Sequence, residues 1–327
     1  MGGNRKEISR GVCAVKALVT GGAGFIGSHL VDRLIVEGWK ARVVDNLSSG
    51  RMENLVHHKN NPNVEIVIGD LKNPETCLKV TKNVDAVFHY AANPEVRVST
   101  TTPEIHFNEN IVVTFNLLEA MRKNDVRGLV FASSSSIYGE PEKIPVKEDA
   151  PIRPVSVYGA SKAACENLIH AYSKLYGIKA VVLRYANVIG PRLRHGVIWD
   201  FIVKLRRNPN ELEILGDGKQ VRSYIYVDDA VEATLLTWKK NTSSFSVYNI
   251  ASEDWIMVKE VADIVVKTLR LKNVKYVYKP LLYGVGWLGD VKKIALDITK
   301  LKELEFKPRM NSSTAVRYAA EQIANEP

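Results

Sequence analysis

A tyrosine and a lysine four residues apart are the most suggestive catalytic pair in this 327-residue chain. The pattern of residues 156–176 predicts a helix, so Tyr158 and Lys162 would share one helix face. An ammonium beside a phenol favours the phenolate, which lowers the pKa of the tyrosine and makes it a usable general base. The spacing alone is common and would also suit a surface helix. It becomes more specific because a serine run, 133–136, follows the apolar segment 129–132.

A glycine cluster near the N-terminus predicts a dinucleotide site. It lies between a short apolar run, residues 17–19, and a segment with helical periodicity, 25–34. Gly21 lets the chain turn sharply, Gly24 allows a pyrophosphate to approach the backbone, and Gly27 allows the helix to pack closely on the strand. The helix N-terminus offers unpaired N–H groups and a positive dipole end. The alternative is a glycine-rich turn without a ligand, but the strand before it and the helix after it favour binding.

Two aspartates at predicted strand ends extend this site. Asp45 follows the apolar run 41–44 and lies 21 residues beyond Gly24, about where an acid binds the adenosine ribose 2′-hydroxyl. A carboxylate there would repel the extra phosphate of NADP, and no arginine follows it directly, so NAD is favoured. An aspartate that only caps the next loop is the alternative. Asp70 ends the strand predicted at 64–68, where it could meet an adenine edge.

The order of predicted elements indicates the fold class. Strands and helices alternate through the first half, which predicts an α/β protein with a Rossmann-type, doubly wound parallel sheet and right-handed crossovers. Ligands of such sheets bind at the carboxyl ends of the strands. From about residue 187 the pattern loosens, and we expect a smaller C-terminal α/β substrate lobe. The expected division is 1–186 for the NAD-binding domain, with 226–250 returning to it, and 187–327 mainly for the lobe.

The composition, with 46% hydrophobic and 25% charged residues, is typical of a soluble globular protein. No apolar run reaches the roughly 18–20 residues that span a bilayer, and no signal-peptide core is present. Three isolated cysteines favour a reducing cytoplasm, and together with scattered histidines they predict no metal site. The net charge of +9 could suit a nucleic acid. Because the basic residues are dispersed, an anionic small substrate explains it more simply.

Motifs spread from Lys16 to about Pro308 resemble the extended short-chain dehydrogenases/reductases. Within them the chain is most similar to the UDP-galactose (UDP-glucose) 4-epimerase family of archaeal type. The motifs are Thr20-Gly21-Gly22-Ala23-Gly24-Phe25-Ile26-Gly27, Val44-Asp45-Asn46-Leu47, Gly69-Asp70-Leu71, Phe88-His89-Tyr90-Ala91-Ala92, the segment 131–139, Tyr158-Gly159-Ala160-Ser161-Lys162 and the segment 184–191. The resemblance implies NAD-dependent 4-epimerisation of a UDP-hexose through a transient 4-keto sugar. It also implies a cytoplasmic homodimer that pairs through the helices predicted at 107–123 and 156–176, without a nucleic-acid or membrane partner.

The resemblance also implies roles for individual residues. Tyr158 would be the catalytic base, Lys162 its electrostatic partner, and Ser134 the hydrogen-bond partner of the reacting hydroxyl. NAD would contact Gly21, Gly24, Phe25, Ile26, Gly27, Asp45, Asn46, Ser48, Ser49, Gly50, Asp70, Leu71, Tyr90, Ala91, Ala92, Asn110, Tyr158, Lys162 and Tyr185. The UDP-sugar would contact Ser134, Ser136, Asn187, Arg192, Val197, Arg222 and Asp290.

Two positions depart from the family pattern. The family often has Arg-x-Gly-Asp where this chain has Trp287-Leu288-Gly289-Asp290, so the arginine that binds the diphosphate is missing at 287. Arg222, or a basic residue such as Arg192, Arg194 or Lys204, would have to replace it. The usual Arg-Asp-(Phe/Tyr) is Arg222-Ser223-Tyr224 here.

Several alternatives stay open. A 4-epimerase for a UDP-N-acetylated sugar or a UDP-uronate shares these features, and the intermediate size of Ile294 does not decide between them. A nucleotide-sugar dehydratase or decarboxylase would need a carboxylate where Ser135 and Ser136 stand. An NAD-dependent RNA-binding protein would use the basic surface, and its affinity would fall steeply with ionic strength.

Overall fold

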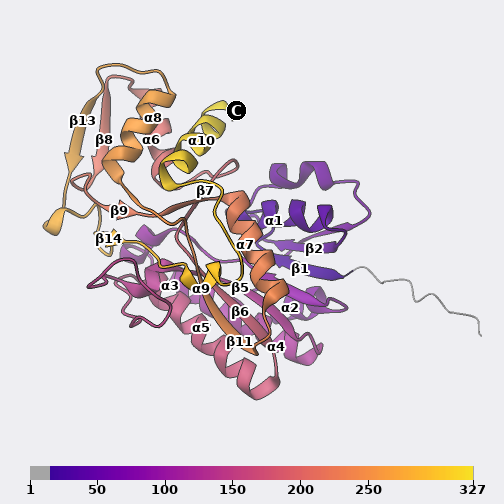
Figure 1. The fold of residues 1–327 in the computed structure, drawn as a ribbon. Helices are drawn as coiled ribbons and strands as arrows, with labels where there is room; N and C mark the ends of the chain where they lie inside the picture. The colour runs from indigo at the N-terminus through magenta and orange to yellow at the C-terminus, as the bar shows by residue number, and fades with distance from the viewer. Residues whose placement is uncertain (1–14, 327) are drawn as a thin grey trace, which may run out of the picture.

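The computed structural model describes residues 15–326 and contains one seven-stranded parallel sheet (Figure 1). In spatial order the strands are β3 (Val64–Ile68), β2 (Lys40–Asp45), β1 (Lys16–Thr20), β4 (Ala86–His89), β5 (Gly128–Ser134), β6 (Lys179–Tyr185) and β11 (Phe245–Ile250). The chain runs outward from β1 in both directions, which makes the β1/β4 boundary the topological switch point of the sheet. The predicted Rossmann-type fold is confirmed.

The apolar runs form strands that are buried on both faces, as parallel sheets require. Alternate residues of β1 enter different cores: Ala17 and Val19 join one hydrophobic cluster and Leu18 joins the other. The first cluster includes residues of α1 (Phe25–Val36) and α7 (Val227–Lys240). The second includes residues of α2 (Pro74–Thr81), α4 (Val113–Lys123) and α5 (Val157–Tyr176). Helices therefore cover both faces of the sheet.

The helix predicted at 107–123 is divided into three parts. It starts as α3 (Glu104–His106), continues as a π-helical turn (Phe107–Val112) and ends as α4. The π-turn lies beside α5, and such turns are frequent at functional sites.

The C-terminal part contributes smaller sheets and three further helices. The helices are α6 (Gly196–Arg207), α8 (Val258–Thr268) and α10 (Ser312–Asn325), and they pack on one another. The sheets pair β8 (Glu211–Leu215) with β13 (Lys275–Lys279), β7 (Asn187–Ile189) with β10 (Tyr224–Tyr226), and β9 (Val221–Arg222) with both β12 (Ile256–Met257) and β14 (Lys293–Ile294). Short helical segments complete the fold: η1 (Met52–His58), η2 (Val96–Thr100), η4 (Ser135–Tyr138), η5 (Leu282–Gly284) and α9 (Thr299–Lys302).

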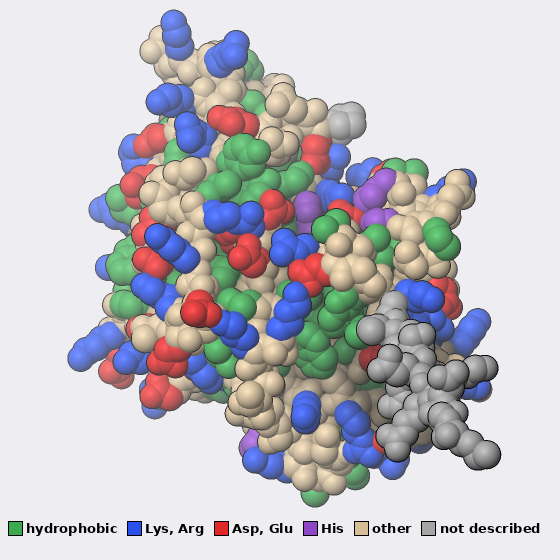
Figure 2. Space-filling model, turned by 45° about the vertical axis from the view of Figure 1, so that its right-hand side comes forward, with side chains coloured by type: hydrophobic (Ala, Val, Ile, Leu, Met, Phe, Trp, Pro, Cys, Tyr) green, Lys and Arg blue, Asp and Glu red, His purple; other side chains and the backbone are tan. Residues whose placement is uncertain are grey.

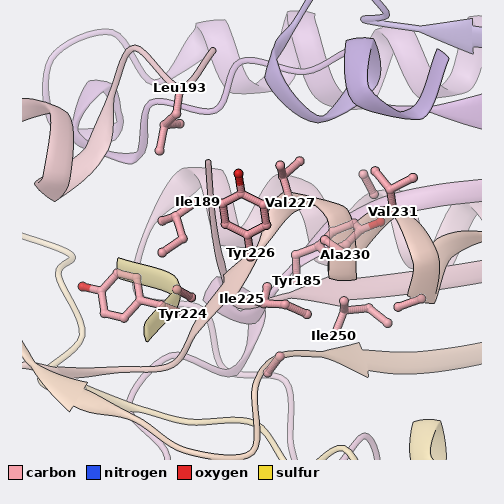
Figure 3. Packing of buried hydrophobic residues seen from close by; sticks show 14 of the residues in the cluster. Tyr185, Ile189, Leu193, Tyr224, Ile225, Tyr226, Val227, Ala230, Val231 and Ile250 are labelled. Carbon is pink, nitrogen blue, oxygen red and sulfur yellow. The ribbon is translucent and has the colours of Figure 1, made fainter. Parts of the chain in front are cut away.

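One hydrophobic cluster joins the large sheet to the smaller elements. Figure 3 shows Tyr185 of β6, Ile189 of β7, Ile225 of β10, Ala230 of α7 and Ile250 of β11 packed together. The segment that contains α7 and β11 thus packs on the sheet, and β11 pairs with β6 along its whole length.

On the face shown in Figure 2, lysine and arginine side chains are dispersed among acidic and apolar ones. None of the helices within residues 15–326 is long and apolar enough to cross a membrane.

Candidate active site

The glycine cluster forms the expected turn between β1 and α1. Gly21 has φ +65°, and a Cβ atom there would lie 2.7 Å from the Ala91 backbone nitrogen. A Cβ atom on Gly27 would lie 2.3 Å from the Gly21 carbonyl oxygen, so neither position has room for a larger residue. Gly24 caps α1 without a side-chain hydrogen bond. The first N–H groups of α1, from Phe25 onward, are therefore not claimed by a capping side chain and are suited to a phosphate group.

Asp45 lies directly against this turn. Its Oδ2 accepts a hydrogen bond from the Ala23 N–H at 3.0 Å, and its Oδ1 accepts one from the Leu47 N–H at 2.8 Å. Burial raises the pKa of the Asp45 carboxyl, while these two bonds oppose the shift. A Cβ on Gly50 would lie 2.7 Å from both carboxylate oxygens. The loop beyond Asp45 thus folds back over the carboxylate, with exposed side chains at Asn46, Ser48 and Ser49.

The ends of β3 and β4 complete the same edge of the sheet. The Tyr90 and Ala91 N–H groups donate to the Thr20 Oγ1 at 3.2 and 3.1 Å, which holds the end of β4 beside β1. Ala91 and Ala92 are partly exposed there. Asp70 follows β3 and its Oδ1 accepts from the Lys72 N–H at 2.8 Å. The glycine turn, two carboxylates and small residues together fit a dinucleotide.

The predicted catalytic residues meet where β5 ends. Ser156 caps α5 by accepting a hydrogen bond from the Gly159 N–H at 3.1 Å. The cap fixes the first turn of α5, which carries Tyr158, and a hydrogen bond links the Tyr158 phenol to Ser134. The Lys162 Nζ lies 5.9 Å from the centroid of the Tyr158 ring. This brings a base, a hydroxyl and a cation together.

The pKa shifts of the pair differ from the expected ones. Burial raises the pKa of Tyr158 to about 12 despite its hydrogen bond with Ser134, and burial lowers that of Lys162 to about 8. Lys162 is therefore already neutral at the pH where Tyr158 ionises. Its Nζ also donates to the Ala132 carbonyl at 2.7 Å. The prediction of a lowered Tyr158 pKa is wrong for this structure, because desolvation of the phenolate outweighs the hydrogen bond with Ser134.

Two residues assigned to the cofactor have their polar atoms engaged within the protein. Asn110 is buried; its Oδ1 accepts from the Asn93 N–H at 2.9 Å and its Nδ2 donates to the Ser161 Oγ at 2.8 Å. The Tyr185 hydroxyl lies 2.7 Å from that of Tyr90, and it is buried too. Both therefore position neighbouring loops. Leu71, also assigned to the cofactor, is 5% exposed.

A buried ion pair that the sequence did not predict lies next to the site. The Arg184 Nη2 on β6 lies 2.7 Å from the Glu166 Oε2 on α5, and both side chains are about 5% exposed. The Ser133 Oγ donates to the Glu166 Oε1 at 2.5 Å. Glu166 thus joins α5 to β5 one residue before Ser134. The sequence signal for this pair is Arg184, a charged residue inside the otherwise apolar run of β6.

The expected diphosphate ligand Arg222 is bound to other groups. Its Nη2 lies 2.7 Å from the Asp290 Oδ1 and also donates to the Val291 carbonyl, and its Nη1 donates to the Val221 carbonyl. The Asp290 side chain is 2% exposed, and its second oxygen accepts from the Gly286 N–H at 2.9 Å. The charge of Arg222 is therefore balanced inside the protein, and the pair fixes the loop before β14.

The other residues assigned to the substrate lie in different settings. The Ser134 Oγ donates to the Ser136 Oγ at 3.1 Å, so these two hydroxyls are adjacent. Asn187 is exposed just beyond β6. Arg192 contacts α1: its Nη2 lies 2.8 Å from the Asp32 Oδ2, so its charge is paired there. Val197 is half-buried in the first turn of α6.

Comparisons with known proteins agree with this geometry. Residues 17–251 match the NAD dependent epimerase/dehydratase family. A Methanocaldococcus jannaschii protein, provisionally named UDP-glucose 4-epimerase, is 38% identical over 94% of this chain and 98% of its own. A crystal structure of a UDP-galactose 4-epimerase is 49% identical, with a TM-score of 0.85, and covers 95% of this chain and 99% of that one.

A third relative is a UDP-N-acetylglucosamine 4-epimerase from Methanobrevibacter ruminantium, solved with UDP-N-acetylmuramic acid. It is 34% identical, with a TM-score of 0.84, over 94% of this chain and 98% of its own. The family match spans most of the chain, and the identities extend over nearly its whole length. The chain therefore belongs to the NAD dependent epimerase/dehydratase family.

Proposed function

We propose that this protein is a UDP-glucose 4-epimerase, which interconverts UDP-galactose and UDP-glucose with NAD as its cofactor. The observation that carries the proposal is the meeting of Ser134, Tyr158 and Lys162 at the end of β5, on the edge of the sheet that also bears the glycine turn. The similarity of the chain to 4-epimerases over 94% or more of its length supports the same activity.

The residues at the strand ends suit NAD. The N-terminus of α1 would bind the pyrophosphate, and Asp45 would accept hydrogen bonds from the adenosine ribose. If Asp45 selects NAD, then Asp45→Ala weakens NAD binding and improves the relative binding of NADP, measured by titration calorimetry. The same preference in the wild-type protein and the variant would contradict this role.

The residues of α5 and β5 would handle the proton of the sugar. Tyr158 takes the proton of the 4-hydroxyl, and the Ser134 hydroxyl orients that group. Bound NAD supplies the reversible acceptance of a hydride from C4, which lets the 4-keto sugar present its opposite face before reduction. Burial holds the Tyr158 pKa near 12 in this structure, and the hydrogen bond with Ser134 opposes that shift and favours the phenolate.

A tyrosine exchange tests the catalytic role. Tyr158→Phe should lower kcat for UDP-galactose by about 10²–10⁴-fold, as loss of a general base does. The matched control is Tyr318→Phe, at an exposed position on α10, which should leave kcat unchanged. Unchanged turnover in Tyr158→Phe, with the fold intact by circular dichroism, would refute the assignment.

The sugar specificity is tested on the same protein. UDP-N-acetylglucosamine and UDP-glucuronate are the alternative substrates, and the first is represented by the M. ruminantium relative. Ser135 and Ser136 carry hydroxyls where a dehydratase or decarboxylase needs a carboxylate. A higher kcat/KM for either alternative sugar than for UDP-galactose would move the proposal to that substrate.

The exposed apolar residues on α4 and α5 support a homodimer. Phe107, Phe115, Leu175 and Tyr176 are 38–72% exposed, on the π-turn and these two helices. We expect a dimer by light scattering and a shift toward monomer in Phe115→Lys. A monomeric wild-type protein across a dilution series would contradict this expectation. We also propose a cytoplasmic location and no nucleic-acid partner; RNA affinity that falls steeply with salt would argue otherwise.

A further inference from the structure

The fold gathers two consecutive histidines and an aspartate that have no role in the proposed catalysis. Asp32 lies on α1, and His57 and His58 end η1. The His57 Nε2 lies 2.7 Å and the His58 Nε2 2.8 Å from the same carboxylate oxygen, Oδ1 of Asp32. We propose that Asp32, His57 and His58 form a binding site for one divalent transition-metal ion.

The positions of the donor atoms suit a metal ion. One ligand atom from each residue lies within 4.8 Å of the other two. Zinc binds imidazole nitrogen and carboxylate oxygen at about 2.0–2.2 Å in tetrahedral sites, so ligand atoms stand about 3.3 Å apart. Separations of 2.7 and 2.8 Å need to widen by only about 0.5 Å, which small side-chain rotations provide. Three protein ligands leave one position for water.

The surroundings meet the chemical needs of such a site. The other carboxylate oxygen, Oδ2 of Asp32, pairs with the Arg192 Nη2 at 2.8 Å, and an outer partner of this kind orients a ligating carboxylate. His58 is buried, whereas the His57 side chain is 45% exposed and gives an ion access.

Ligation through Nε2 requires the proton of each imidazole to lie on Nδ1. The His58 Nδ1 lies 3.3 Å from the Asn61 Nδ2. The Asn61 Oδ1 accepts a hydrogen bond from the Asn63 N–H at 3.0 Å, which holds the amide in this orientation. Metal binding would therefore move the His58 proton from Nε2 to Nδ1 and separate Nδ1 from the Asn61 Nδ2.

The donor set defines the class of ion. Two imidazole nitrogens and one carboxylate suit Zn²⁺, Co²⁺, Ni²⁺ or Cu²⁺, whereas Mg²⁺ and Ca²⁺ prefer oxygen ligands throughout. The bound ion would fasten η1 to α1. Because η1 follows the loop that folds over Asp45, the ion would stabilise the adenosine side of the proposed cofactor site without touching the reacting atoms.

Cobalt titration of the full-length protein, free of any affinity tag, tests the site. We expect visible d–d absorption that saturates at one equivalent of Co²⁺ per chain and is lost when Zn²⁺ is added. Zn²⁺ should also raise the melting temperature, because it binds the native state. His57→Ala is the main variant since His57 is exposed, and Asp32→Ala is the second. The matched control is His170→Ala, an exposed histidine on α5 outside the cluster.

The site is supported if His170→Ala behaves as the wild-type protein and His57→Ala loses both the cobalt spectrum and the zinc-dependent shift. The proposal is overturned if the wild-type protein binds no Co²⁺, or if His57→Ala binds it equally well. Metal binding is read without any substrate, so its failure leaves the proposed epimerase activity untouched.

Discussion

Replacing Glu166 by glutamine removes the negative charge from a buried ion pair and leaves the Arg184 guanidinium without its counter-ion. Both side chains are about 5% exposed, and Glu166 accepts hydrogen bonds from Arg184 and Ser133. Removing one partner of a buried pair typically costs 3–5 kcal/mol. Glutamine keeps the shape and one acceptor, and Arg184 keeps its bond to the Tyr138 hydroxyl at 2.8 Å. We therefore expect a loss near the lower limit, about 3 kcal/mol, or roughly a hundredfold in the unfolding equilibrium.

Equilibrium unfolding in guanidinium chloride, followed by circular dichroism, measures this loss. The control is Glu119→Gln, which breaks a similar pair with Arg122 at 2.9 Å, but with side chains 26% and 39% exposed. Its effect should be much smaller because water screens exposed pairs. The double variant Glu166→Leu with Arg184→Met should recover much of the stability, because no unpaired charge is buried. A loss in Glu166→Gln no larger than in the control would refute this account of the pair.

Three further predictions concern Lys162, Gly27 and His89. The Lys162 pKa of about 8 predicts that kcat falls as pH rises through 8, and Lys162→Met should lose this pH dependence. The variant should also lose about a hundredfold in kcat, since a charge 5.9 Å from the centroid of the Tyr158 ring is worth about 2.8 kcal/mol at a dielectric constant of about 20. Equal pH profiles of kcat for the wild-type protein and Lys162→Met would contradict this role of Lys162. Gly27→Ala should destabilise the protein by about 1–3 kcal/mol and weaken its binding of NAD, because its Cβ meets the Gly21 carbonyl. An NAD affinity equal to that of the wild-type protein would contradict this. Burial lowers the pKa of His89 to about 3. As pH falls below about 6.5, His89 therefore binds a proton in the unfolded chain but stays neutral in the folded one. Stability should then decline by up to about 1.4 kcal/mol per pH unit, and less steeply in His89→Gln, measured by denaturant unfolding at each pH.

The sheet and the glycine turn could be predicted because their signals are local. Strands such as β1 and β5 are continuous apolar runs that end at glycine or serine, and both lie within two residues of their predicted limits. The strand β11 was not identified as such, although its segment was expected to return to the sheet. Its sequence includes buried Asn249, which accepts from the Tyr138 hydroxyl, a residue 111 positions away. A polar residue of this kind is suited to a strand only once its distant partner is in place.

Parts of the candidate site depended on distant partners in the same way. Arg222 carries the charge expected of a phosphate ligand, but its pairing with Asp290, 68 positions along the chain, is a product of the fold. The histidines appeared scattered in the sequence. His57 and His58 reach Asp32 only because η1 packs on α1. The Tyr158 pKa likewise depends on burial, which a helical spacing does not reveal.

Incubation of the purified protein with UDP-galactose, with and without added NAD, tests the central claim most directly. Chromatography of the nucleotide sugars should show UDP-glucose accumulating to equilibrium without net NADH, and the rate should not depend on added NAD if the cofactor is retained. UDP-galactose that stays unchanged in the presence of NAD would contradict the account. The missing arginine at position 287 would then be the first residue to examine.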